Sequence, residues 1–124
     1  HFDDSTISHV PENTHVEPWV DQVDALAEAA AVVCHGGSGT VLGAIYSGRP
    51  VVVVPRFADQ FENGRRIAEA GAGLTVDAGA PSERVTAALK EVLRDPLYGL
   101  AAARIGSEMR SAPTPAEVLD YLTR

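Results

Sequence analysis

Short apolar runs alternate along the chain with segments of helical periodicity, an order that is typical of βαβ units. The clearest strand is formed by four consecutive valines at residues 51–54, which end at Pro55. A continuous apolar run of this kind fits a parallel strand that is covered on both faces. The pattern predicts strands at residues 14–17, 31–34, 51–54 and 73–76.

The helical segments are bounded by residues that start or stop helices. Pro50 disfavours a helical conformation at Arg49, and Gly71 suits a left-handed stop. Thr114 and Glu117 match a capping box, with Pro115 at the first helical position. The predicted helices lie at residues 21–30, 40–47, 60–70 and 82–93, from Asp95-Pro96 onward, and at residues 114–122.

Together these elements predict an α/β fold, a Rossmann-like doubly wound parallel sheet with helices on both faces. In such sheets, ligands bind beyond the carboxyl ends of the strands. Trp19 follows the first predicted strand, residues 35–40 follow the second, and residues 56–60 follow the third. We therefore expect these three groups to converge on one site.

Composition narrows the class of protein. At 124 residues the chain fits one domain, and with 45% hydrophobic but only 6% aromatic residues its core must consist mainly of Ala, Val and Leu. The net charge is −7 and the Lys and Arg residues are scattered, which argues against nucleic acids and anionic membranes as partners. No apolar run approaches the roughly 18 residues of a membrane span, and the N-terminus has no signal-peptide pattern.

Cysteine and histidine usage bears on compartment and metals. The single cysteine, Cys34, excludes an intrachain disulfide and suggests a reducing compartment, so we expect a cytoplasmic protein. Cys34 and the histidines His9, His15 and His35 lack the spacing of metal ligands. The sequence therefore predicts no metal site.

The segment VCHGGSGTVLG, residues 33–43, carries the candidate chemistry. It lacks the lysine of a Walker A loop, and its glycines do not match the spacing of a dinucleotide GxGxxG motif or of a GxSxG nucleophile elbow. Glycines, free N–H groups at a helix start, two hydroxyls and an imidazole would suit a diphosphate. A strand-to-helix turn capped by Ser38, with His35 bonded to the backbone, fits the same local sequence.

Three segments within residues 10–76 extend this pattern: VPENTHVEPWVDQ, VVCHGGSGTVLGAIYSGRPVVVVP and DQFENGRRIAEAGAGL. In this order and spacing they resemble the donor-binding signature of nucleotide-sugar glycosyltransferases with the GT-B fold. That family includes plant secondary-metabolite, mammalian glucuronosyl and actinomycete antibiotic enzymes. The richness in Ala, Val, Gly and Arg resembles the bacterial natural-product branch.

The resemblance implies roles for individual residues. Trp19 would stack on the pyrimidine base, the backbone of Val20 would read the edge of that base, and Gln22 would bond the ribose unless it is a solvated first-turn residue. The Asp59-Gln60 pair would bond hydroxyls of the transferred sugar, and Asp59 would also be able to cap a helix. The diphosphate would be held by His35, Gly37, Ser38, Gly39 and Thr40, with the imidazole offsetting the charge of the leaving group. Asn63 matches a family position, and its role would be structural rather than catalytic. Neither a cofactor nor a metal ion is expected.

One position departs from the family pattern. The family commonly has a glutamate that holds ribose hydroxyls, and Gly43 stands at that position here. The loss of two hydroxyl acceptors puts strong selection for a ribonucleotide in doubt. A thymidine diphosphate donor would be affected less.

The resemblance also implies an activity for a larger protein. Residues 1–124 would be the donor-binding part of an inverting glycosyltransferase, in which a base deprotonates an acceptor hydroxyl that displaces dTDP or UDP from the sugar. The base and the site for the small natural-product acceptor would belong to an N-terminal domain. We expect the chain to begin inside the C-terminal domain, after its first strand, first helix and second strand, to be inactive alone, and to expose a sheet edge.

Two other classes fit the same signature. One is a nucleotide-sugar epimerase of the same fold, and the other is a non-catalytic nucleotide-sugar-binding accessory domain. The sequence names neither the sugar nor the acceptor.

Overall fold

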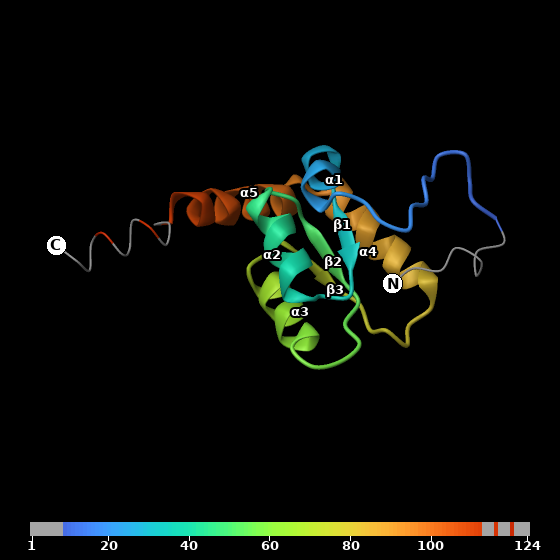
Figure 1. Cartoon of the computed structure of the whole chain (residues 1–124). Coiled ribbons are helices and arrows are strands. Elements are labelled where there is room, and N and C mark those ends of the chain that lie inside the picture. The colour runs from blue at the N-terminus through green and yellow to red at the C-terminus, as the bar shows by residue number, and fades with distance from the viewer. Residues whose placement is uncertain (1–8, 113–115, 117–119, 121–124) are drawn as a thin grey trace.

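The computed structural model describes residues 9–112, 116 and 120, and within them three strands form one parallel sheet (Figure 1). The strands are β1 (Val32–Cys34), β2 (Val51–Val53) and β3 (Gly73–Thr75), in the order β1-β2-β3. Val51 lies opposite Val32 on one side and opposite Gly73 on the other. Since all three strands run the same way, the loops that follow them leave from the same edge of the sheet.

Helices connect and cover the strands. The five helices in the described part of the chain are α1 (Gln22–Glu28), α2 (Ser38–Tyr46), α3 (Gln60–Glu69), α4 (Ser82–Arg94) and α5 (Pro96–Ser111). Each lies where the sequence predicts a helix, with bounds shifted by a few residues. Asp95 caps α5 by accepting a hydrogen bond from the Leu97 N–H, and Pro96 occupies the first turn, as expected. The final helix predicted at residues 114–122 lies outside the described residues, apart from 116 and 120.

The strand predicted at residues 14–17 is wrong. These residues pair with no other strand and, except for the half-buried Val16, lie exposed. The Thr14 N–H instead closes a turn on the Pro11 carbonyl, at 3.0 Å. A strand needs a neighbour to satisfy its backbone groups, and local sequence cannot show whether one is present.

β2 is the centre of the core, and helices cover both of its faces as predicted. Val51, Val52 and Val53 are all fully buried. On one face, Val51 and Val53 pack in a cluster with residues of α1, α2, α3 and α5, and on the other, Val52 packs with Ala88 and Val92 of α4. Figure 1 shows α2 and α3 on one side of the sheet and α4 on the other. The connecting helices α2 and α3 lie on the same face of the sheet and α4 covers the other face, so the predicted α/β arrangement of a parallel sheet between helices is confirmed.

α5 approaches α2 so closely that a glycine is required at the contact. A Cβ atom at Gly106 would lie 2.3 Å from the Ile45 carbonyl oxygen and 3.1 Å from that of Tyr46. Gly99, on the same helix, has no heavy atom within 4 Å of its equivalent position. The close packing of α5 on α2 therefore requires glycine at position 106 but not at position 99.

We predict that Gly106→Ala lowers the free energy of unfolding by about 1–3 kcal/mol, because α5 must move away from α2. Gly99→Ala should raise it by about 0.5–1 kcal/mol, since alanine favours a helix over glycine without meeting any neighbour. Urea denaturation at an unchanged m-value measures both. Equal shifts of the two midpoints would contradict the close contact.

Candidate functional site

The loop between β1 and α2 turns sharply against the end of β2. Gly36 has a φ of 98°, a left-handed conformation that favours glycine. A Cβ atom there would lie 2.7 Å from the Val53 side chain and 3.1 Å from the Gln60 carbonyl oxygen. Gly36 therefore lets this loop touch both β2 and the start of α3.

The first turn of α2 presents unpaired N–H groups. The Val41 N–H bonds back to the Gly37 carbonyl at 3.0 Å, whereas the N–H groups of Ser38, Gly39 and Thr40 have no acceptor among the described residues. No side chain caps this helix, so the alternative of a turn capped by Ser38 is not what the structure shows. The space beside Gly39 is open, with no heavy atom within 4 Å of a Cβ placed there. An anion has both room and hydrogen-bond donors at this point.

His35 is held in one orientation by the backbone. The Gly37 N–H donates to His35 Nδ1 at 2.9 Å, so in the neutral imidazole Nε2 carries the proton. The ring lies so close to Gly37 that a Cβ atom there would be 2.6 Å from His35 Cε1. Nε2 has no partner within the described part of the chain and lies on an exposed residue. A neutral His35 can therefore donate a hydrogen bond to a ligand.

Hydrogen bonds join this loop to the one that follows β2. Ser38 Oγ donates to Asp59 Oδ2 at 3.2 Å. Asn63 Nδ2, one turn into α3, lies 2.8 Å from the Gly36 carbonyl oxygen and 3.2 Å from Ser38 Oγ. Asp59 occupies the N-cap position of α3 without a side-chain capping bond. The predicted meeting of residues 35–40 with residues 56–60 is thus present in the fold.

No hydrogen bond within the described residues joins Trp19, Val20 or Gln22 to this network, and the expected convergence of Trp19 with the two loops stays a prediction. Trp19 is 77% exposed, and among the described residues no hydrogen bond or ring contact joins it to either loop. The exposed Val20 leads into α1, which Asp21 caps through a 3.1 Å hydrogen bond from the Asp24 N–H. Gln22 Nε2 is 2.6 Å from where a Gly43 Cβ would be. Gln22 therefore lies against α2 at Gly43.

Cys34, the last residue of β1, is half-buried and its thiol is not activated as a nucleophile. Burial raises the pKa of its thiol, and a hydrogen bond from the Gly36 backbone lowers it by a smaller amount. A thiol of raised pKa is neutral at physiological pH and is a poor nucleophile.

No metal centre is evident in the described ranges, where no group of three His, Cys, Asp or Glu residues lies close enough together to hold an ion. The prediction that no metal is needed stays a prediction. Among the described helices, none is long and apolar enough to cross a membrane.

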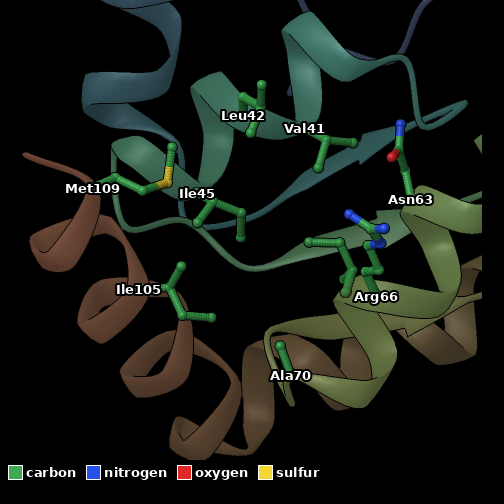
Figure 2. Close-up of a pocket in the computed structure, with 9 residues that line it drawn as sticks. Val41, Leu42, Ile45, Asn63, Arg66, Ala70, Ile105 and Met109 are labelled. Atoms are coloured by element: carbon green, nitrogen blue, oxygen red, sulfur yellow. The ribbon is translucent and has the colours of Figure 1, made fainter. Parts of the chain in front are cut away.

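Two apolar hollows of the surface are lined by residues of α2 and its neighbouring helices. An apolar pocket of about 250 Å³ between α2, α3 and α5 contains Asn63 at one end and Met109 at the other (Figure 2). A second pocket of about 360 Å³ is lined by Gln22, Gly43 and Tyr46 among others. Neither is lined by His35, Ser38 or Asp59. Convergent polar groups rather than volume therefore mark the candidate site.

Two features of the loop after β2 could not be predicted from the sequence. Ala58 has a φ of 58°, and the Gln60 side chain turns inward, 6% exposed, to accept hydrogen bonds from the backbone. An alanine carries no signal of a left-handed conformation, and a polar residue at a helix start is normally taken as exposed.

Known proteins are similar to this chain both in sequence and in fold. The elloramycin glycosyltransferase ElmGT of Streptomyces olivaceus is 38% identical over 112 residues, which cover 90% of this chain and 28% of that protein. The human UDP-glucuronosyltransferase 2B17 is 38% identical over 100 residues, or 78% of this chain and 19% of that enzyme. The chain thus spans less than a third of the length of these relatives.

Solved structures of glycosyltransferases have the same fold as this chain. The glycosyltransferase VinC in complex with dTDP superposes with a TM-score of 0.88 at 30% identity, covering 97% of this chain and 31% of that one. The spinosyn rhamnosyltransferase SpnG complexed with thymidine diphosphate gives 0.88 at 32% identity, with 97% and 33% covered. The predicted relation to GT-B glycosyltransferases is confirmed.

The family described as erythromycin biosynthesis protein CIII-like, C-terminal domain, matches residues 2–124. Its match extends over nearly the whole sequence, and the relatives and solved structures named above are glycosyltransferases. The chain therefore belongs to the erythromycin biosynthesis protein CIII-like C-terminal domain family.

Proposed function

We propose that this chain binds the nucleoside-diphosphate sugar of a glycosyltransferase that modifies a natural product. The observation that carries the proposal is the junction between the β1–α2 loop and the loop that follows β2. There, the unpaired N–H groups of the α2 start and the Nε2 donor of His35 belong to the same loop as Ser38, whose hydroxyl donates a hydrogen bond to the Asp59 carboxylate. A nucleotide sugar needs both kinds of group, hydrogen-bond donors for its diphosphate and an acceptor for its sugar hydroxyls.

The diphosphate would be bound by neutral groups. The chain carries a net charge of −7, and the hydrogen-bond donors assigned to the diphosphate are N–H groups of the α2 start and the imidazole of His35. Such donors suit a leaving group whose negative charge grows as the bond to the sugar breaks, because they are already oriented toward it. This is why His35, Ser38, Gly39 and Thr40 are assigned to the diphosphate. Gly37 orients His35 instead, because its N–H donates a hydrogen bond to His35 Nδ1.

The nucleoside would lie on the α1 side of the junction. Trp19 offers an exposed indole face, on which a base can stack for roughly 1–3 kcal/mol. Gln22 meets α2 at Gly43, where the surface offers an amide and no carboxylate to the ribose. Two structural relatives, VinC and SpnG, were solved with thymidine diphosphate. These points favour dTDP over UDP as the nucleotide.

The reaction would be an inverting transfer. An acceptor hydroxyl forms a bond to the anomeric carbon of the sugar while the bond from that carbon to the diphosphate oxygen breaks. The hydroxyl proton passes to a base, which we assign to a part of the enzyme other than this chain. The contribution of this chain is to hold the leaving diphosphate and to fix the sugar.

Nucleotide binding is measurable through Trp19, the single tryptophan of the chain. Titration with thymidine diphosphate should change its fluorescence in a saturable manner, with a higher affinity than for uridine diphosphate. His35→Ala should weaken binding by about 10- to 100-fold, the typical effect of losing a hydrogen bond to a charged group. His9→Ala serves as the control, since His9 is exposed and outside the site, and it should bind as the parent does. Saturable binding that His35→Ala leaves unchanged would contradict the assignment of the diphosphate.

The space beside Gly39 gives an independent test. Gly39→Leu puts a good helix former where the free chain has no neighbour, so the free energy of unfolding should not fall. The side chain would occupy the room that we assign to the diphosphate, and affinity for thymidine diphosphate should fall by at least about tenfold. Urea denaturation and the Trp19 titration separate the two effects. Undiminished affinity in a stable variant would show that the diphosphate does not lie at the start of α2.

A further inference from the structure

Helix α1 has little apolar contact to hold it in place. Of its seven residues only Leu26 is buried, and the others are exposed. Helices shorter than about 12 residues are marginally stable in water by themselves, so α1 depends on contacts with the rest of the fold. Trp19 and Val20 come shortly before α1 and Gln22 begins it. The position of this helix therefore decides where the proposed nucleoside contacts lie.

Arg49, from the turn between α2 and β2, supplies a contact at the far end of α1. Its Nε donates to the Leu26 carbonyl at 2.9 Å, and its Nη2 donates to the Ala27 carbonyl at 2.8 Å. These carbonyls lie in the last turn of α1, where a helix has unpaired acceptors and partial negative charge. α1 has no basic residue of its own in that turn and ends at Glu28. Arg49 therefore provides the donors and the positive charge that this helix end lacks.

The backbone of Arg49 is itself fixed to the core. Its N–H bonds the Ala44 carbonyl of α2 at 2.9 Å. Pro50, the next residue, is buried, and its carbonyl accepts the Val32 N–H of β1 at 3.0 Å. The Arg49 side chain thus joins the end of α1 to a part of the chain that α2 and the sheet already hold.

The contacts of α1 with α2 depend on this placement. Gln22 Nε2 lies 2.6 Å, and Leu26 Cδ1 3.4 Å, from the point where a Cβ atom of Gly43 would be. If the hydrogen bonds from Arg49 were lost, the Leu26 side chain would be the one buried contact left to α1. Gln22 and Trp19 would then move relative to the start of α2.

We propose that Arg49 is a positioning residue for the nucleoside, whose two hydrogen bonds fix α1 against α2 and thereby place Trp19 and Gln22 beside the diphosphate site. This proposal rests on the proposed function of the site. Arg49 acts through α1, because its guanidinium binds the opposite end of that helix from Gln22. Its loss should weaken the binding of a nucleoside and spare the binding of a diphosphate at the α2 start.

Three variants separate this role from general effects of charge. Arg49→Met keeps much of the side-chain length but removes the donors and the charge. Arg49→Lys keeps a charge near the end of α1 and can donate to one carbonyl, but it lacks the planar fork of the guanidinium. Arg84→Met is the matched control, since it removes the same charge from an exposed arginine of α4, on the other face of the sheet.

The experiment has two readouts on the 124-residue chain. Amide hydrogen exchange of Ala25 and Ala29, which bond the Asp21 and Ala25 carbonyls, follows α1. Calorimetric titration with thymidine diphosphate and with pyrophosphate separates the nucleoside from the diphosphate. We expect Arg49→Met to lower the amide protection and the affinity for thymidine diphosphate by at least about tenfold each, and to keep the affinity for pyrophosphate within about threefold.

The other variants extend the comparison. Arg49→Lys should lie between Arg49→Met and the parent chain in both readouts, and Arg84→Met should match the parent chain. Should Arg49→Met fail to fold, Arg49→Lys carries the test with the same readouts. A loss of thymidine diphosphate affinity that is as large in Arg84→Met as in Arg49→Met would mean that only the net charge matters, and the proposal would be wrong.

Two further results would overturn the proposal. One is unchanged amide protection of α1 in Arg49→Met. The other is an equal loss of affinity for thymidine diphosphate and for pyrophosphate, which would show that Arg49 acts on the diphosphate or on the whole fold. If the parent chain binds neither compound, the proposed function is what fails, and the exchange comparison between Arg49→Met and Arg84→Met alone decides whether Arg49 holds α1.

Discussion

The structure depends on the complete burial of β2 between two parallel strands and two layers of helices. Val51 and Val53 face one layer and Val52 faces the other, and none of the three retains exposed surface. A strand buried on both faces must be parallel to its neighbours when its connections are crossover helices, so β1 and β2 end at the same edge of the sheet. The loops that carry the polar chemistry meet because β2 is buried.

The β1–α2 loop and the loop after β2 come into direct contact at Gly36. Gly36 lets the first loop touch Val53 and the backbone of Gln60, and the hydrogen bonds of Asn63 and Ser38 join the two loops across that contact. The resulting surface combines an unpaired helix start with a carboxylate, in a chain of net negative charge. The donors at this surface are the unpaired N–H groups of the α2 start and the imidazole fixed by Gly37, a combination that suits an anion.

Much of the fold could be predicted because local patterns report burial. The valine run, the amphipathic residues 82–93 and the Asp95-Pro96 start each describe an element that forms for local reasons, and the structure has all three. The strand predicted at residues 14–17 failed because pairing depends on a neighbour that local sequence does not reveal. The structure brings the glycine-rich β1–α2 loop and the loop that carries Asp59 and Gln60 together, as the strand order predicted. The motif did not reveal that the Gln60 side chain is buried and bonds the backbone.

By itself, the sequence determined the order and type of the elements from residue 21 to residue 111, the family to which the chain belongs and the residue types at the two loops. These follow from periodicity, helix-stop residues and motif spacing, all of which are local properties. Only the tertiary structure decided that Ser38 bonds Asp59, that Gln22 lies against Gly43, that Ala58 adopts a left-handed conformation and that Gln60 turns inward. Each of these results from contacts between residues or loops whose mutual position is set by packing around β2, and no pattern along one segment of chain encodes such a position.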